Sequence, residues 1–289
     1  MVELQSTLRF ALDLDPDLGR PGIPDGEWAL ARSACPVETF ALPTGSWDVA
    51  GASAALESFA FVLVDGAVAR EIVLRDRHLL ELLGPGDVVL PPARDMSLDT
   101  GLPLTVTTTF VSGRAFALGE AFATACSRWP SLLADVMRRT GQQHERLAVQ
   151  ALIVHLPVAE HRLLLQLWHL TSRWGRVTKD GILFPFSLTH EMLGHLIAAR
   201  RPTVTLAATN LQATDCLHRL DDGTWLLTEA GERRARRMVE RSDLPGSLGE
   251  ALQLRQETAE LCGEARALRS EARQAKAQRA RIMRAGDHP

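Results

Sequence analysis

The segment "HLIAARRPTVTLAATNLQ", residues 195–212, decides the fold prediction. An apolar helical stretch stops near Ala199, and Arg200 and Arg201 lead at once into a second helix. Its first-turn proline is tolerated because the amide at that position has no helical partner. At about 100° per residue, one side of this second helix carries Val204, Ala207, Ala208 and Leu211. The opposite side carries Pro202, Thr205, Leu206 and Thr209. We therefore expect two tightly joined helices, of which the second buries a face of small residues and exposes the other.

The flanking residues extend this pair into a recognisable motif. Thr189 is placed to cap the first helix, and Asp222-Gly223 separates two short strand-like pieces after the second, which predicts a hairpin. Two helices followed by such a hairpin are the layout of a winged helix-turn-helix, whose second helix reads the DNA major groove. Arginine suits guanine edges and phosphates, threonine suits phosphates or bases, and leucine suits the thymine methyl. The candidate DNA contacts are Thr189, His190, Arg200, Arg201, Pro202, Thr203, Thr205, Leu206, Thr209 and Arg219.

The region before the motif predicts a β-domain. Residues 37–125 contain short runs rich in Val, Thr and Phe, separated by Asp65-Gly66 and by Gly84-Pro85-Gly86-Asp87. Such runs and turn residues indicate strands joined by tight turns, in a small barrel or roll. Residues 1–36 are rich in Pro, Gly and Asp and predict an irregular lead-in. With the helices that follow, the expected class is α+β.

A long helix is predicted within residues 126–157, beginning after Trp129-Pro130 and ending at Pro157. At 1.5 Å per residue it would be about 35 Å long, which a small roll cannot cover fully. A second copy of the same helix would cover the remainder, so we expect a homodimer. The candidate interface residues, spaced three to four apart, are Leu133, Val136, Met137, Thr140, His144, Leu147 and Ala151.

Together these features resemble the Crp/Fnr family of bacterial transcription regulators, over residues 37–230. The sharpest piece is "LTHEMLGHLIAARRPTVTLAATNLQ", in which Gly194 and Arg201-Pro202-Thr203-Val204 stand where the family keeps like residues. The resemblance implies a β-roll sensor, a dimerisation helix (126–157) and a DNA-binding domain (158–247). It also implies that Arg201, Pro202 and Thr205 face base edges.

The sensor region departs from the family pattern for cyclic nucleotides. Family members that bind them use a Gly-Glu pair for the ribose and an arginine for the phosphate, after the turn that here reads "GPGDVVLP". This chain continues with "PPARDMSLDTGLPLTVTTT", which has no Gly-Glu pair and only Arg94 as a candidate cation. An unpaired phosphate in a cleft is costly. We therefore expect no cyclic AMP binding, and the effector, if there is one, stays unidentified.

Residues 248–289 form a separate extension with a seven-residue repeat. Leucine, alanine or isoleucine recurs at Leu254, Leu261, Leu268, Ala275 and Ile282. This spacing is typical of a coiled coil, and a helix that forms only on a protein partner fits it equally well. It leaves a second functional hypothesis open, in which the protein is an interaction scaffold with a ligand-free roll and a docking tail.

Charge and composition restrict the function further. Residues 1–125 hold 8 basic and 17 acidic groups, a net −9, whereas residues 126–157, 158–243 and 244–289 each carry +2. Only the back half therefore suits a polyanion. No apolar run reaches the roughly 18 residues of a membrane span, and no secretory signal is evident, so a cytoplasmic protein is expected.

We expect neither an enzyme nor a bound metal or cofactor. The chain lacks GxSxG, Walker A and GxGxxG motifs, and its cysteines, at positions 35, 126, 216 and 262, form no CxxC pair. "HEMLGH" resembles the zinc-binding HExxH, but its histidines are five residues apart. That spacing turns them about 140° from each other on a helix, so they cannot share one ion.

Overall fold

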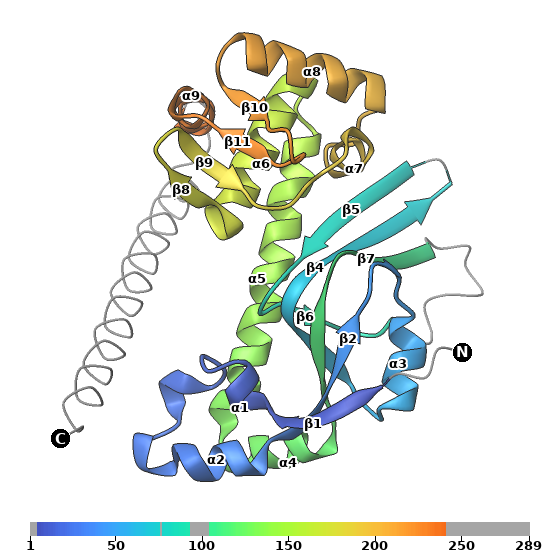
Figure 1. Ribbon diagram of the computed structural model, residues 1–289, viewed down its shortest axis with the longest axis vertical. Helices are drawn as coiled ribbons and strands as arrows, with labels where there is room; N and C mark the ends of the chain where they lie inside the picture. Colours follow the sequence, from blue (N-terminus) through green and yellow to red (C-terminus); the bar gives the residue numbers. More distant parts are fainter. Residues whose placement is uncertain (1–4, 76, 93–103, 241–289) are drawn as a thin grey trace, which may run out of the picture.

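The computed structural model describes residues 5–75, 77–92 and 104–240. A seven-stranded sheet and a four-stranded sheet occupy opposite ends of the molecule, and the helix α5 (Pro130–Val154) runs between them (Figure 1). This arrangement confirms the α+β class, with a β-roll, a long helix and a helix-turn-helix. The predicted helical extension, residues 248–289, lies outside the described residues. None of the described helices is long and apolar enough to cross a membrane.

The large sheet is antiparallel and closes into a roll. Five strands lie in the order β1 (Ser6–Phe10), β2 (Pro36–Leu42), β7 (Leu104–Leu118), β4 (Ala60–Leu74) and β5 (Arg77–Leu83). The short β3 (Gly45–Ser46) pairs with β7, and β6 (Val88–Val89) pairs with β4. Inside the roll, beside helix α3 (Val49–Ala55), three rings pack with centroids 5.4–6.1 Å apart: Phe40, Trp47 and Phe61. The roll is therefore built round an aromatic core.

The predicted turn at Asp65-Gly66 is wrong. β4 continues through these residues, and its register with β7 shifts there, which marks a β-bulge. Gly66 has φ +82°, and Gly113 lies opposite it, where a Cβ would stand 2.1 Å from the Asp65 carbonyl oxygen. Glycine thus serves a bulge in a long strand here. By contrast, the predicted turn at residues 84–87 is present, with the Asp87 amide donating to the Gly84 carbonyl at 3.0 Å.

The predicted irregular lead-in is also wrong for residues 5–35. β1 pairs with β2 along its whole length, and the segment contains α1 (Ala11–Leu14), the 3₁₀ turns Arg20–Gly22 and Asp25–Glu27, and α2 (Trp28–Ala34). Ala11, Leu12 and Leu18 are buried against the first turns of α5 and α4 (Glu120–Arg128). Asp15 forms an ion pair with Arg139 of α5. Tertiary burial and a buried ion pair thus order a segment whose composition favours loops.

Residues 126–157 comprise more than one helix, because residues 126–128 belong to α4 and α5 starts at Pro130. The predicted interface residues of α5 differ in how far they are exposed to solvent. Val136 is only 5% exposed and packs in the core of its own chain, so its assignment to a dimer seam is corrected. Leu133 and Met137 are 47% and 62% exposed. His144 and Ala151 are exposed too, while Thr140 and Leu147 are half-buried. The solvent-facing stripe is therefore narrower than predicted.

The second domain contains three helices, a small sheet and a final helix. In chain order these are α6 (Ala159–Trp174), β8 (Arg176–Thr178), β9 (Gly181–Phe184), α7 (His190–Leu196), α8 (Arg201–Ala213), β10 (Leu217–Arg219), β11 (Trp225–Leu227) and α9 (Glu229–Glu240). The strands form one antiparallel sheet in the order β10-β11-β9-β8. α6 packs against α8, α9 and β9, and a single apolar cluster joins all of these elements. α8 lies at the end of the molecule farthest from the roll (Figure 1).

Candidate nucleic-acid interface

The joint between α7 and α8 has the tightness that the sequence predicts. The Thr189 hydroxyl caps α7 by accepting a hydrogen bond from the Met192 amide at 3.2 Å. α7 ends at Leu196, three residues before the predicted end near Ala199, and the chain reverses through Ala198, whose φ is +49°. A Cβ at Gly194 would lie 2.5 Å from the Ala199 carbonyl oxygen. Gly194 therefore permits the turn to pack directly on α7.

α8 buries and exposes the faces expected from its periodicity. Val204, Ala207 and Leu211 are at most 4% exposed and belong to the domain core. The opposite face is open to solvent and carries Arg201, Pro202, Thr205, Leu206 and Thr209. Leu206 is 63% exposed, so its side chain is open to a partner on this face. A helix held along one small-residue face leaves the other free to enter a groove.

Hydrogen bonds fix the threonine hydroxyls of this face. Thr205 donates to the Arg201 carbonyl and Thr209 to the Thr205 carbonyl, each at 3.0 Å. A hydroxyl has one proton, so each of these oxygens can only accept further hydrogen bonds, and that of Thr205 already lies 2.9 Å from Nδ1 of His190. In this state they suit the amino groups of adenine or cytosine better than a phosphate oxygen.

Positive charge gathers where α7, α8 and the wing meet. The Nδ1 atom of His190 lies 2.9 Å from the Thr205 hydroxyl, and its ring packs against Trp225. Burial, with Arg219 and Arg201 nearby, lowers the pKa of His190. Within residues 5–75, 77–92 and 104–240, no ion-pair partner lies beside Arg200, Arg201 or Arg219. Charge left uncompensated at a surface favours a polyanionic partner.

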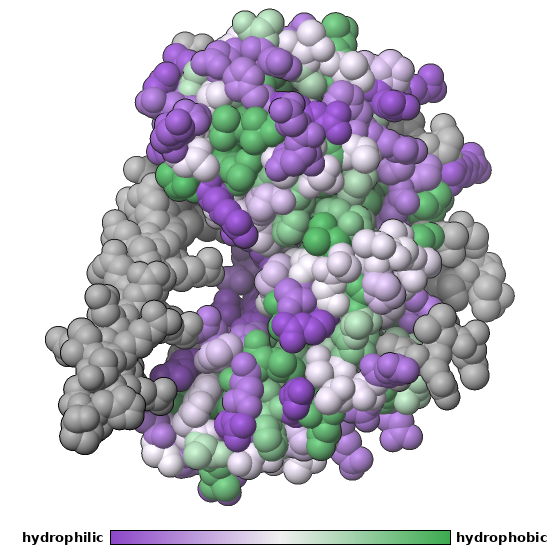
Figure 2. Space-filling model, viewed as in Figure 1, coloured by the Kyte–Doolittle hydropathy of each residue, from purple (hydrophilic) through white to green (hydrophobic). Residues whose placement is uncertain are grey.

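The segment predicted to form a wing is a short hairpin, β10-β11, tied to the helix pair. Asp222 accepts hydrogen bonds from the amide and hydroxyl of Thr224, at 2.9 and 2.6 Å, and Gly223 has φ +82°. Trp225 of β11 is buried and donates from its indole nitrogen to the Leu188 carbonyl at 3.1 Å. The Arg219 guanidinium lies 5.9 Å from the centroid of the same ring. The hairpin therefore holds Arg219 beside Trp225, close to His190 of α7. Figure 2 shows many hydrophilic residues, with some hydrophobic ones among them, over the end of the molecule that carries α8.

Two buried polar side chains, Asp87 and Gln150, link the roll and α5 to the second domain, and sequence reasoning missed their role. The Asp87 side chain is only 2% exposed and accepts a hydrogen bond from the Gly84 amide. The same carboxylate forms ion pairs with Arg146 of α5, at 2.7 Å, and with Arg173 of α6, at 2.6 Å. Burial lowers the pKa of Arg146 despite this carboxylate. Gln150 of α5 donates to the carbonyls of Leu80 and Leu196, at 2.7 and 3.1 Å. The sequence marks Asp87 only as a turn residue, because the arginines that it pairs with lie about 60 and 90 residues farther along the chain.

Comparison with solved structures identifies the fold. Over 82% of this chain and 97% of the other, the structure matches a CooA variant from Carboxydothermus hydrogenoformans with a TM-score of 0.58 at 14% sequence identity. FixK2 from Bradyrhizobium japonicum matches over 70% of this chain and 96% of its own, with a TM-score of 0.52 at 14% identity. The chain has the Crp/Fnr regulator fold. A CRP/FNR-family transcriptional regulator from Thermus thermophilus also matches, covering 68% of this chain and 98% of its own at 15% identity and a TM-score of 0.47.

The Crp/Fnr resemblance seen in residues 188–212 is thus confirmed at the level of fold. No family model and no curated protein sequence matches the chain. Within the Crp/Fnr fold, the structure brings seven of the predicted contact residues onto α8 or into the turn before it: Arg200, Arg201, Pro202, Thr203, Thr205, Leu206 and Thr209. Thr189 and His190 lie at the start of α7, and Arg219 lies on β10. Arg94, the candidate phosphate ligand in the roll, lies outside the described residues.

Proposed function

We propose that this protein is a sequence-specific DNA-binding transcription regulator that acts as a homodimer. The exposed face of α8 carries the proposal, because it combines arginine, threonine and leucine groups with no ion-pair partner for its arginines among the described residues. α8 would enter the major groove, with Arg201 donating to a guanine edge and Leu206 against a thymine methyl. Arg219 on the wing would contact the phosphate backbone.

The outward stripe of α5 supports the homodimer. Leu133 and Met137 are large, apolar and about half exposed or more, and Leu152, at 63%, extends the stripe towards the second domain. A second copy of α5 would remove these side chains from water, at about 25 cal/mol for each Å² buried. A two-fold dimer places two copies of α8 on successive turns of DNA, which predicts an inverted-repeat operator.

Selection from a genome tests this function. Sheared genomic DNA is bound to the purified protein at moderate salt, because phosphate contacts are salt-sensitive, and the retained fragments are sequenced. Leu206→Glu places a carboxylate on the α8 face. Val177→Glu makes the same change on β8, where the side chain is 87% exposed. We expect an inverted repeat from the wild type and from Val177→Glu, and none from Leu206→Glu. Recovery of the same motif by Leu206→Glu would exclude α8 as the reading helix.

A further inference from the structure

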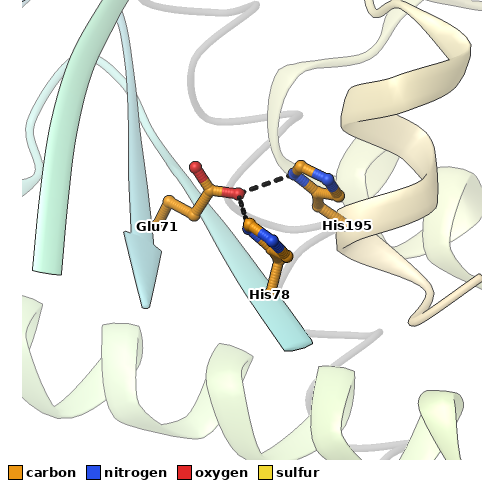
Figure 3. Close-up of side chains that lie close together, drawn as sticks. All are labelled: Glu71, His78 and His195. Atoms are coloured by element: carbon orange, nitrogen blue, oxygen red, sulfur yellow. Dashed lines mark hydrogen bonds and ion pairs between the residues drawn. The ribbon is translucent and has the colours of Figure 1, made fainter. Parts of the chain in front are cut away.

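Two side chains of one hairpin in the roll meet a third from α7 of the DNA-binding domain. Glu71 lies on β4, His78 on β5 and His195 on α7 (Figure 3). Residue 78 pairs with residue 73, so His78 and Glu71 are diagonal neighbours on one face of the hairpin. α7 packs on β5 and brings His195 to them. The cluster thus has two members in the sensor and one in the DNA-binding domain.

The ring nitrogens converge on one carboxylate oxygen. The Nδ1 atoms of His78 and His195 lie 2.8 and 2.7 Å from Oε1 of Glu71. The two rings are stacked, with centroids 4.5 Å apart and planes 14° from parallel. Stacking directs both Nδ1 atoms at the same point, and the three ligand atoms all lie within 4.8 Å of one another. Two imidazoles and a carboxylate converging in this way are a donor set used by zinc.

From this geometry we infer that Glu71, His78 and His195 bind a divalent transition-metal ion, with Zn²⁺ the best match. Around a metal ion with bonds of about 2.0–2.2 Å, neighbouring ligand atoms lie slightly farther apart than the 2.7–2.8 Å between Oε1 of Glu71 and the two ring nitrogens. A small rotation of the Glu71 side chain would supply the difference. Each neutral imidazole then carries its proton on Nε2 and coordinates through Nδ1. Mg²⁺ and Ca²⁺ are disfavoured because they prefer all-oxygen sites.

The site is accessible to an ion and to water. The side chains of Glu71, His78 and His195 are 25%, 34% and 29% exposed, so none is sealed in the core. Within the described part of the chain, the cluster offers three protein ligands. Water would complete a tetrahedral site. His190, the other histidine of the HEMLGH segment, is not part of this cluster. It lies at the opposite end of α7 and contacts Thr205. This agrees with the five-residue spacing, which predicts that His190 and His195 cannot share one ion.

Such an ion would act as a clip between sensor and DNA-binding domain, an inference that rests on the proposed function. α7 leads through a four-residue turn into α8, so fixing His195 to the roll also restricts the orientation of the reading helix. An ion favours one orientation of the two domains over another only if it binds to that orientation more tightly. Because the ligands come from both domains, we expect tight binding only in the orientation that brings His195 to Glu71 and His78.

Metal binding is tested first without DNA. Full-length chelator-treated protein is titrated with Co²⁺ in the presence of a reductant, followed by its visible d–d absorption, and Zn²⁺ affinity is measured by competition with a chromophoric chelator. Thiolate charge-transfer bands distinguish any cysteine site. We expect one ion per chain, d–d bands without thiolate absorption, and affinity at least ~10-fold weaker in His78→Ala and in His195→Ala.

His218→Ala is the matched control, because His218 also contacts a single carboxylate, that of Asp215, at 2.7 Å. Its side chain is 32% exposed, much like those of His78 and His195. It should leave the affinity unchanged. Equal Co²⁺ and Zn²⁺ binding by the wild type and His195→Ala, or no binding by either, would overturn the site and leave a hydrogen-bonded cluster. These results do not depend on whether the protein binds DNA.

Regulation is tested by titrating the selected operator with and without one equivalent of Zn²⁺. We expect the ion to change the operator affinity of the wild type and of His218→Ala, and to leave that of His195→Ala unchanged. An ion that binds with no effect on operator affinity would overturn the clip while confirming the site.

Discussion

Replacing Asp87 by asparagine should destabilise the protein more than any exposed charge would. Asp87 is 2% exposed and faces two guanidinium groups, those of Arg146 and Arg173, whose side chains are 23% and 22% exposed. Asparagine keeps an oxygen for the Gly84 amide, so the turn is retained and only the charge is lost. Arg146 and Arg173 then lose the carboxylate that they share. Removing one partner of a buried ion pair typically costs about 3–5 kcal/mol of unfolding free energy.

Urea unfolding measures this loss against a surface control. The pair Asp65–Arg114 also links a carboxylate to an arginine, at 2.5 Å, but its side chains are 45% and 55% exposed. Asp65→Asn should therefore cost only about 0–1 kcal/mol. A loss of less than about 1 kcal/mol in Asp87→Asn, no larger than in the control, would refute the view that this carboxylate joins the roll to α5 and α6.

Further substitutions test the interface, the charge cluster and the turn. Met137→Arg should convert dimers to monomers in sedimentation experiments, whereas Val136→Ala should keep the dimer and lower the free energy of unfolding by about 2 kcal/mol; a monomeric Val136→Ala would reverse these roles. Because the pKa of His190 is lowered in the free protein and a nearby phosphate would raise it, binding takes up a proton. Operator affinity should then rise as the pH falls from about 8 to 6, and a His190→Gln variant should lose this dependence. Gly194→Ala should reduce stability by about 1–3 kcal/mol in thermal unfolding, because its Cβ would meet the Ala199 carbonyl; an unchanged melting temperature would show that the turn is loose.

Local patterns were sufficient to predict the helix pair and the hairpin of the second domain. The period of Val204, Ala207 and Leu211 fixes the buried face of α8, and the cap at Thr189 and the turn at Asp222-Gly223 depend on neighbouring residues only. Such features are encoded within a few residues, so sequence reasoning finds them. It failed at Gly66 because a bulge and a tight turn demand the same glycine conformation, and only the pairing of β4 with β7 distinguishes them.

Long-range contacts explain what the sequence could not predict. Val136 follows the helical stripe but faces the lead-in, whose folding depends on burial against α5. Asp87 looked like a turn residue, because its arginines are supplied by two distant helices. Glu71, His78 and His195 belong to three elements of two domains, so no spacing rule for metal ligands could associate them.

Titrating the selected operator with Arg201→Ala and with Arg176→Ala tests the central claim most directly. Both arginines are exposed in the same domain, one at the start of α8 and the other on β8. If Arg201 reads a base, its loss should cost about 1–3 kcal/mol, roughly 5- to 150-fold in affinity, and relax the preference at one base pair of each half-site. Arg176→Ala should bind like the wild type. Equal affinities and an unchanged base preference in the two variants would contradict the assignment of α8 as the DNA-reading helix.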